Sequence, residues 1–462
     1  NREMKNDQPK AGLPNLKPSI IWMINFGFLG VQMAFTLQSS QMSRIFQTIG
    51  ANPNDLGWFF ILPPLAGLVV QPLVGYFSDR TWAPKLGGRR LPYLLLGTIV
   101  AVIVMCLLPN SGSLGLGYAS MAAMCFAAIT VAFLDLSSNV AMQPFKMMIG
   151  DMVNDKQKSY AYGIQSFLSN TGAVLAAVFP FVLTFFGVAN TAHKGDVPMS
   201  VKLSFYIGAA ILIVTSLFTV FRVHEYDPQT YAKYHGISEE DNEEKVGMFT
   251  LLKKAPKAFW TVTLVQFFCW FAFQYLWTYS NGAIAANVWH TTNTASAGFQ
   301  AAGNWYGILA AVQSIAAVIW SYVLAKLPNN MHKLGYAGSL ALGAIGFGSV
   351  FFVHSKMLLI VSFTLVGIAW AAMNTYPLTI VTNALSGKHM GTYLGLFNGS
   401  ICLPQIVASL ASFVIFPLLG GKQTNMFLLA GIVMLLGAVA VFAIKETSAE
   451  APEEPHTPIE EE

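Results

Sequence analysis

Long apolar segments separated by short polar ones dominate the chain. A helix that crosses a bilayer needs about 20 consecutive apolar residues, so uncharged runs of that length mark candidate spans. Six are expected before the long polar connection at 222–257. The first two lie in 18–43 and 56–78; the run 90–135, with a turn-rich break at 109–117, holds the third and most of the fourth; the last two lie in 159–193 and 203–221. Six more follow it: two within 258–325, then 334–355, 357–387, 389–421 and 423–444.

Composition agrees with this pattern and excludes a soluble protein. Only 10% of the 462 residues are charged and 54% are hydrophobic, whereas soluble domains average about 25% charged residues. The apolar blocks are of helix length and do not alternate as barrel strands do. We therefore predict an all-α membrane protein with twelve transmembrane helices in two six-helix halves. The four cysteines lie inside apolar blocks, which argues against disulfides and thiolate metal sites, and we expect no cofactor and no bound metal.

Basic residues give the expected orientation. With both termini in the cytoplasm, cytoplasmic segments hold twenty Lys and Arg, and outer loops hold five, Arg44 among them. The expected organisation is a cytoplasmic segment at 1–19 without a signal peptide, a half at 20–223, a cytoplasmic linker at 224–256, a half at 257–445 and an acidic cytoplasmic tail at 446–462. Two six-helix halves around a long linker resemble the major facilitator architecture, in which the halves rock around a midplane site.

One carboxylate stands apart from the other acidic residues. Asp135 is the only acid expected in the middle of a membrane helix, where an ionised carboxylate costs several kcal/mol. Burial favours its protonated form and makes reversible protonation possible. Asn139 lies one turn on and Lys146 lies about 20° from the same face, with Gln143 beside them. We predict Asp135 and Lys146 as proton-coupling residues; the alternative is an acid kept only for helix packing.

Uncharged polar and aromatic residues fill the other helices. Amides offer donors and acceptors to hydroxyl groups, and aromatic rings stack on the apolar faces of pyranoses, so the combination suits a sugar. For each residue, bonding between helices is an equally good explanation. The candidate substrate-binding residues are Gln32, Gln38, Asn139, Gln143, Gln165, Asn170, Trp270, Gln274, Trp277, Asn374, Tyr376, Asn398 and Gln405.

The connection between the second and third helices carries a charged motif. It runs Gly75-Tyr-Phe-Ser-Asp79-Arg80 and ends in Gly-Gly-Arg89-Arg90. Glycine permits close helix approach, and an acid beside a cationic cluster can lock neighbouring helix ends. These five residues are predicted to form a gating loop. It is similar to the major facilitator loop signature, although the same charges also serve as a topology signal.

Several segments together resemble one family. Val31-Gln-Met-Ala-Phe-Thr-Leu-Gln-Ser39, Asp135-Leu-Ser-Ser-Asn139 with Gln143-Pro144, 267–278 and Leu394 through Gln405 are similar to motifs of plant sucrose–proton symporters and their bacterial disaccharide-transporting relatives. These belong to the glycoside-pentoside-hexuronide cation symporter group of the major facilitator superfamily. The resemblance implies that Asp135 couples protons, that Gln32, Gln38 and Asn139 line the pocket, and that Asn398 and Gln405 contribute to it.

One departure weakens transfer of the plant substrate. The plant pattern has arginine where this chain has Lys146, so a point charge replaces a bidentate fork. We therefore expect a symporter that imports an α-glucoside such as maltose or sucrose with protons, by alternating access. It would act as a monomer in the cell membrane, without a nucleic-acid partner. The alternatives are a proton-coupled exporter of amphipathic compounds, a sodium-coupled glycoside symporter and a non-transporting sugar sensor. The chain has no nucleophile elbow or phosphate-binding glycine loop, which argues against an enzyme.

Overall fold

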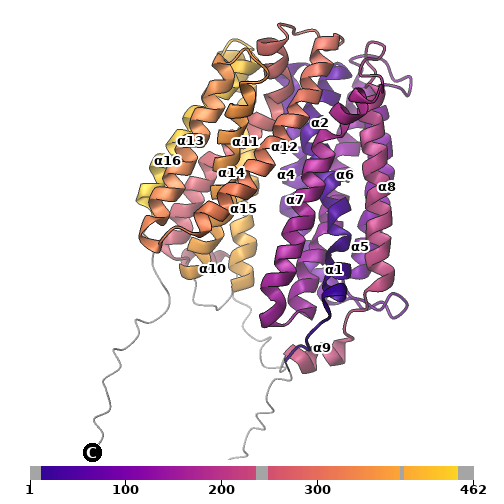
Figure 1. Cartoon of the computed structure of the whole chain (residues 1–462), viewed down its shortest axis with the longest axis vertical. Coiled ribbons are helices and arrows are strands. Elements are labelled where there is room, and N and C mark those ends of the chain that lie inside the picture. The colour runs from indigo at the N-terminus through magenta and orange to yellow at the C-terminus, as the bar shows by residue number, and fades with distance from the viewer. Residues whose placement is uncertain (1–11, 236–247, 385–389, 446–462) are drawn as a thin grey trace, which may run out of the picture.

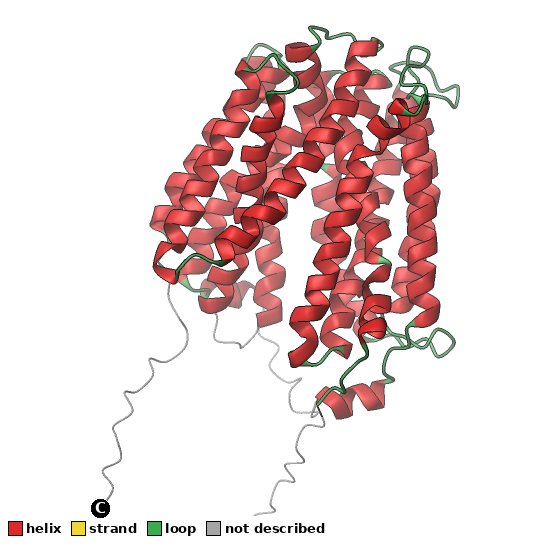
Figure 2. Ribbon diagram, viewed as in Figure 1, coloured by secondary structure: helices red, strands yellow, loops and turns green. Residues whose placement is uncertain are grey.

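Helices make up nearly all the regular structure of the computed structural model, which describes residues 12–235, 248–384 and 390–445 (Figure 2). Within those ranges no β-strand forms, and the sole bridge pairs Ala83 with Gly88. Twelve helical segments are long and apolar enough to cross a membrane. The predicted fold class is therefore confirmed.

The N-terminal half contains the first six spans, and two of them are broken. Its helices are α1 (Pro18–Phe26) with α2 (Phe28–Thr48), η1 (Pro53–Asp55) and α3 (Leu56–Phe60) with α4 (Leu62–Asp79), α5 (Leu91–Leu107) with η2 (Leu108–Asn110), α6 (Met121–Met152), α7 (Asp155–Phe185) and α8 (Met199–Arg222).

The C-terminal half follows two short helices, α9 (Pro228–His235) and α10 (Met248–Lys253). Its helices are α11 (Lys257–Val288), α12 (Ala297–Ala325), η4 (Asn329–Met331) with α13 (His332–Phe352), α14 (Leu359–Ala384), α15 (Met390–Leu418) and α16 (Gln423–Ala440) with η5 (Val441–Ala443).

The break between α1 and α2 lies where three helices crowd together. A Cβ atom on Gly27 would lie 2.7 Å from the Phe145 ring of α6 and 3.0 Å from the backbone of Ser216 on α8. The backbone N–H of Gly27 also donates to the Thr219 hydroxyl of α8. Glycine suits this approach, because a Cβ atom would have to displace the buried Phe145 ring and would also press on the backbone of α8. The first span is thereby fixed against the helices that flank it.

The two halves make their mutual hydrogen bonds toward one end of the bundle. We call the end where α1 begins and α6 ends the terminal end, and the opposite one, where α2 ends and α12 begins, the far end. Among the described residues, hydrogen bonds between the halves lie in the far-end part: from the last turns of α2 to α11, α12 and α16, from Gln274 to Phe60, and from Asn304 to Thr184. In Figure 1 the halves meet near the top and diverge toward α9 and α10. This is a state closed at the far end.

Two residues expected in outer loops lie within helices. One is Lys202, which is 8% exposed and lies in the first turn of α8, because that helix begins at Met199. Arg44 falls within α2 and is only 1% exposed, and its side chain points into the contact between the halves. The prediction of an outer-loop position for Arg44 is therefore wrong, because the α2 helix continues to Thr48 past the end of the uncharged run.

Candidate functional site

Asp135 lies in the middle of α6, buried between two amide side chains. The residue is 5% exposed. Gln38 of α2 donates from Nε2 to Oδ1 at 3.0 Å, and Asn139, one turn further along α6, donates from Nδ2 to Oδ2 at 2.9 Å. Two of the predicted pocket residues thus contact the predicted proton-coupling residue.

A third amide, which the sequence did not single out, extends this group onto α4. Gln71 donates from Nε2 to Oδ1 of Asn139 at 3.2 Å. The bond orients Asn139 so that its own N–H groups face Asp135. A single glutamine inside the second apolar block was the available signal. We call Gln38, Gln71, Asp135 and Asn139 the carboxylate cluster; it joins α2, α4 and α6 of the N-terminal half.

The electrostatics of the carboxylate cluster permit two protonation states. Burial in an apolar bundle penalises the ionised carboxylate, while two amide N–H donors stabilise it. No Lys, Arg or His nitrogen lies within 4.0 Å of Asp135 in the described part of the chain. Burial favours the protonated form of Asp135, and the amide donors favour the ionised form. Without a cation to hold it ionised, the carboxylate is suited to bind and release a proton.

Lys146 lies on the same face of α6 but does not contact Asp135. Eleven residues at 1.5 Å each separate the two by about 16 Å along the helix axis. Lys146 is exposed, in the part of α6 toward the terminal end. In this conformation the structure therefore does not bring the two predicted coupling residues together.

An aromatic group occupies the C-terminal half. The ring centroids of Trp270 and Trp370 are 5.3 Å apart, those of Trp277 and Trp370 are 6.2 Å apart, and Phe273 lies 5.0 Å from Trp370. Trp277 and Trp370 are half-buried, and Asn374, one turn from Trp370, is exposed. Trp370 was missed; its i,i+4 spacing to Asn374 on one face of α14 was the signal. We call Trp270, Trp277 and Trp370 the tryptophan group.

The remaining candidate amides of the N-terminal half bond within that half. Gln32 accepts from the Ser169 hydroxyl at 3.1 Å. Gln165 donates to Asn25 at 3.3 Å and to the Phe145 carbonyl at 3.2 Å, and Asn170 donates to the Ser166 hydroxyl at 3.3 Å. Gln143 is half-buried. These contacts tie α2, α6 and α7 together and do not reach the carboxylate cluster.

Some candidate residues of the C-terminal half are buried in packing contacts, and others are partly exposed. Gln274 is 2% exposed and donates to the Phe60 carbonyl at 2.7 Å and the Ser409 hydroxyl at 2.8 Å, which is a packing contact. Tyr376 is buried and stacks on Tyr336 at 5.3 Å. Asn398 and Gln405 of α15 are half-buried.

The predicted gating loop closes onto α6 at the terminal end. Arg90 donates from Nε to Asp151 at 3.0 Å and bonds to the Ser78 hydroxyl, and Arg89 approaches Asp151 at 3.6 Å. Asp151 is the last acid of α6. Arg80 is exposed.

Of the two remaining members of the predicted loop, Gly75 has described surroundings and Asp79 does not. The side chain of Asp79 lies outside the described residues, and a Cβ atom on Gly75 would meet nothing within 4 Å. Arg89 and Arg90 therefore bind within the N-terminal half in this state.

An acid that the sequence did not single out, Glu225, adds a further contact at the terminal end. Glu225 follows α8 and accepts from the backbone N–H groups of Arg90 and Leu91 at 2.9 and 3.1 Å. It therefore caps α5, whose free N–H groups favour an anion. Burial, the main cause, raises its pKa to about 7, and the nearby Asp151 carboxylate raises it further while the backbone donors and Arg90 lower it.

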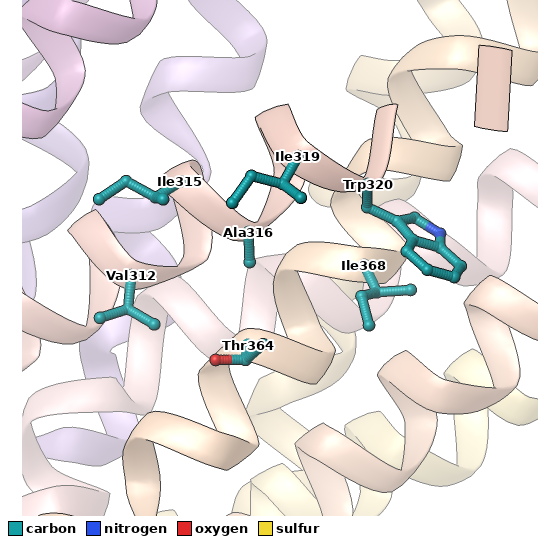
Figure 3. A pocket seen from close by; sticks show the side chains of 7 residues that line it. All are labelled: Val312, Ile315, Ala316, Ile319, Trp320, Thr364 and Ile368. Carbon is teal, nitrogen blue, oxygen red and sulfur yellow. The ribbon is translucent and has the colours of Figure 1, made fainter. Parts of the chain in front are cut away.

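A groove on the outer side of α12 and α14 is apolar and separate from these groups. Figure 3 shows its seven lining residues, six of them apolar side chains. Val312, Ile315 and Ile319 of α12 face Ile368 of α14, with Thr364 as the only hydroxyl. It offers a sugar no set of donors and acceptors. Among the described residues, no group of three or more His, Cys, Asp or Glu side chains could hold a metal ion.

The chain matches known transporters over most of its length. A sequence model of the Major Facilitator Superfamily matches residues 24–409. The sucrose transport protein SUC4 of Arabidopsis thaliana is 21% identical over 457 residues, covering 92% of this chain and 89% of that protein. The sucrose transport protein SUT5 of Oryza sativa subsp. indica is 24% identical over 486 residues, covering 90% of this chain and 86% of that protein.

Solved structures agree on the fold. The inward open conformation of the xylose transporter XylE from E. coli has a TM-score of 0.68 at 13% identity, covering 94% of this chain and 97% of that one. The nucleoside transporter NupG has a TM-score of 0.63 at 13% identity, covering 92% and 98%.

Proposed function

Because the chain belongs to the Major Facilitator Superfamily, we propose that it is a proton-coupled symporter that imports a disaccharide by alternating access. Relatives named sucrose transport proteins, alike over nearly the whole chain, support a sugar as substrate. The observation that carries the proton coupling is the buried Asp135 carboxylate, held by two neutral amide donors. An α-glucoside such as maltose or sucrose is the proposed cargo.

The proton step takes place on Asp135. The neutral carboxyl group suits the apolar bundle while the sugar is carried, and Gln38 and Asn139 stabilise the carboxylate once the proton has left for water. In this proposal Lys146, exposed toward the terminal end of α6, provides a positive charge along the route by which the proton leaves. Direct pairing with Asp135 would need a different conformation.

The sugar is proposed to bind between the carboxylate cluster and the tryptophan group. The half-buried faces of Trp277 and Trp370 offer apolar surface to a pyranose ring. Asn374 and Gln71 offer amides to its hydroxyl groups from opposite halves. Alternating exposure then follows from the rocking of the halves around this region.

The orientation and location belong to the same proposal. With Arg44 and Lys202 inside helices, three basic residues remain in the outer loops, against twenty expected in cytoplasmic segments. This difference supports the proposal that both termini lie in the cytoplasm of a cell-membrane protein. The far end is then external, and the state closed there faces inward. We propose a functional monomer, since each chain carries both halves.

Uptake into proteoliposomes tests the proposal. An inward gradient of one pH unit supplies about 1.4 kcal/mol per proton, and 100 mV adds about 2.3 kcal/mol. One proton per sugar then sustains accumulation of about 500-fold. Labelled maltose and sucrose are to be followed with and without an uncoupler. We expect Asp135→Asn to abolish accumulation while sugar exchange across the membrane persists.

The control is Asp55→Asn, which removes an exposed acid at the far end of the fold. It should leave accumulation unchanged. Persistence of pH-driven accumulation in Asp135→Asn would overturn the assignment of the proton site. Accumulation driven by a sodium gradient and insensitive to the uncoupler would replace the proton with sodium.

A further inference from the structure

Arg44 is the most deeply buried cation of the described chain. It lies in the last turns of α2 and is 1% exposed. A guanidinium group has five N–H donors, and all five are used. Nε donates to Gln300 Oε1 at 2.8 Å, Nη1 to Asn304 Oδ1 at 2.8 Å and Gln41 Oε1 at 3.4 Å, and Nη2 to Asn190 Oδ1 at 2.8 Å and the Gln300 carbonyl at 3.0 Å.

These acceptors belong to both halves. Gln41 and Asn190 lie in the N-terminal half, whereas Gln300 and Asn304 lie on α12 of the C-terminal half. Three of the five bonds therefore cross between halves. We call Arg44 with these four partners the guanidinium cage.

Other contacts at the far end hold the guanidinium cage in shape. Gln300 donates to the Thr48 hydroxyl at 3.0 Å, and Asn304 donates to the Thr184 hydroxyl at 2.8 Å. Each of these bonds crosses between halves as well. A Cβ atom on Gly303 would lie 2.5 Å from Cδ of Arg44, so glycine at this position gives the side chain room to enter.

Every acceptor in the guanidinium cage is neutral. No carboxylate lies within 4.0 Å of Arg44 in the described ranges. A buried cation without a counter-ion depends on its hydrogen bonds, because each unmet donor costs the desolvation of a charged group. Separating the halves would remove three acceptors at once and leave the guanidinium to water.

We propose that Arg44 is a latch for the far end: its guanidinium holds the two halves closed there and is released only when that end opens. The proposal rests on the alternating access of the proposed function, but on neither the sugar nor the proton. Neutral acceptors make the latch releasable. Hydrogen bonds to amide and carbonyl oxygens hold the cation without the attraction of a buried ion pair. The closed state seen here is the state that the latch favours.

Cysteine labelling in nanodiscs tests this without sugar or gradient. The full chain is prepared with its four native cysteines replaced by alanine, and one reporter is added. Thr278→Cys reports the far end, because Thr278 is 2% exposed and accepts from the Ser43 hydroxyl across the halves at 2.8 Å. Asn374→Cys reports access from the other end, because Asn374, midway along α14, is exposed while the far end is closed. Rates with a hydrophilic maleimide are compared.

Arg44→Gln should raise the rate at the Thr278→Cys reporter about tenfold or more, because losing one bond to a charged group changes an equilibrium by that factor. The rate at Asn374→Cys should fall. The matched control is Lys202→Gln, another buried far-end cation, which pairs with Asp196 at 3.0 Å within one half. It should change neither rate.

A second variant acts in the opposite direction. Gln300→Glu places a carboxylate against Nε of Arg44 and should lower the rate at Thr278→Cys. Unchanged rates in a folded Arg44→Gln protein would overturn the latch, and so would faster labelling in Gln300→Glu if Arg44→Gln does not fold. Failure of sugar uptake by the unsubstituted chain, with the labelling pattern intact in the reporter chains, would count against the proposed function alone.

Discussion

Glu225 provides a quantitative test of the terminal end. Its carboxylate is 8% exposed and accepts from the backbone N–H groups of Arg90 and Leu91, while its own N–H donates to the Gly87 carbonyl at 2.7 Å. The groups around it are His224 beside it in sequence, Arg90, and Asp151 of α6. Burial is the main cause that raises its pKa to about 7.

The raised pKa of Glu225 determines how the stability of the fold changes with pH. A carboxyl group with a raised pKa binds its proton more tightly in the folded chain than in the unfolded one. The stability of the fold is therefore greatest below the ordinary pKa of 4.5 and falls until the pH passes about 7. The difference between these pKa values corresponds to about 3 kcal/mol. Wild-type protein should thus lose stability between pH 5 and pH 8 through this group.

Glu225→Gln removes the titration and keeps an oxygen for the two backbone donors. We expect its melting temperature to depend less on pH than that of the wild type, by a few degrees between pH 5 and pH 8. Melting is to be followed in detergent at one fixed heating rate, since membrane proteins often unfold irreversibly. The difference between the two proteins isolates this one group from every other titration.

The control is Asp227→Asn, two residues further on. Asp227 is exposed, and its hydrogen bonds with Thr230 lower its pKa, so it stays ionised in the folded and the unfolded chain across this range. The pH dependence should match that of the wild type. If Glu225→Gln also shows the wild-type dependence, the raised pKa and the reasoning from burial are refuted.

Three further changes test other parts of the structure. Gly307→Ala puts a Cβ atom 2.1 Å from the Ala177 carbonyl of the opposite half and should destabilise the fold by about 1–3 kcal/mol, measured by melting, whereas Gly338→Ala meets nothing within 4 Å and should not. Trp370→Ala should weaken sugar binding about tenfold, measured by the sugar-dependent rise in melting temperature. Lys146→Gln should slow proton-driven uptake but preserve sugar exchange in a counterflow assay.

The membrane helices could be predicted because the bilayer imposes a length on each of them. Runs of about 20 apolar residues are set by hydrocarbon thickness, independently of what each helix packs against. The breaks at Gly27 and Ile61 were not predictable in the same way. The Gly27 break follows from close approach to α6 and α8, and such approach is a tertiary property.

The sequence predicted the candidate site most clearly at the residue whose charge is costly to bury in a membrane. Asp135 stands out because few acids survive inside an apolar block. Amides carry no such signal, since a glutamine serves packing and binding equally well: Gln38 contacts Asp135, whereas Gln274 joins the two halves through the Phe60 carbonyl. Gln71 was missed for the same reason, although it orients Asn139.

For Arg44 the sequence predicted a wrong position although the residue is charged. Arg44 lies on α2, as does Gln38 of the carboxylate cluster. An arginine at the edge of an apolar run looks like a loop residue, and only the contact with the other half reveals that it points inward. Along α2, Gln38 turns an amide N–H toward a carboxylate, and Gln41 turns an amide oxygen toward a guanidinium. Each keeps its other polar atom buried and unpartnered, Oε1 of Gln38 and Nε2 of Gln41. The buried carboxylate and the buried guanidinium therefore hold two amides, one turn apart on α2, in opposite orientations.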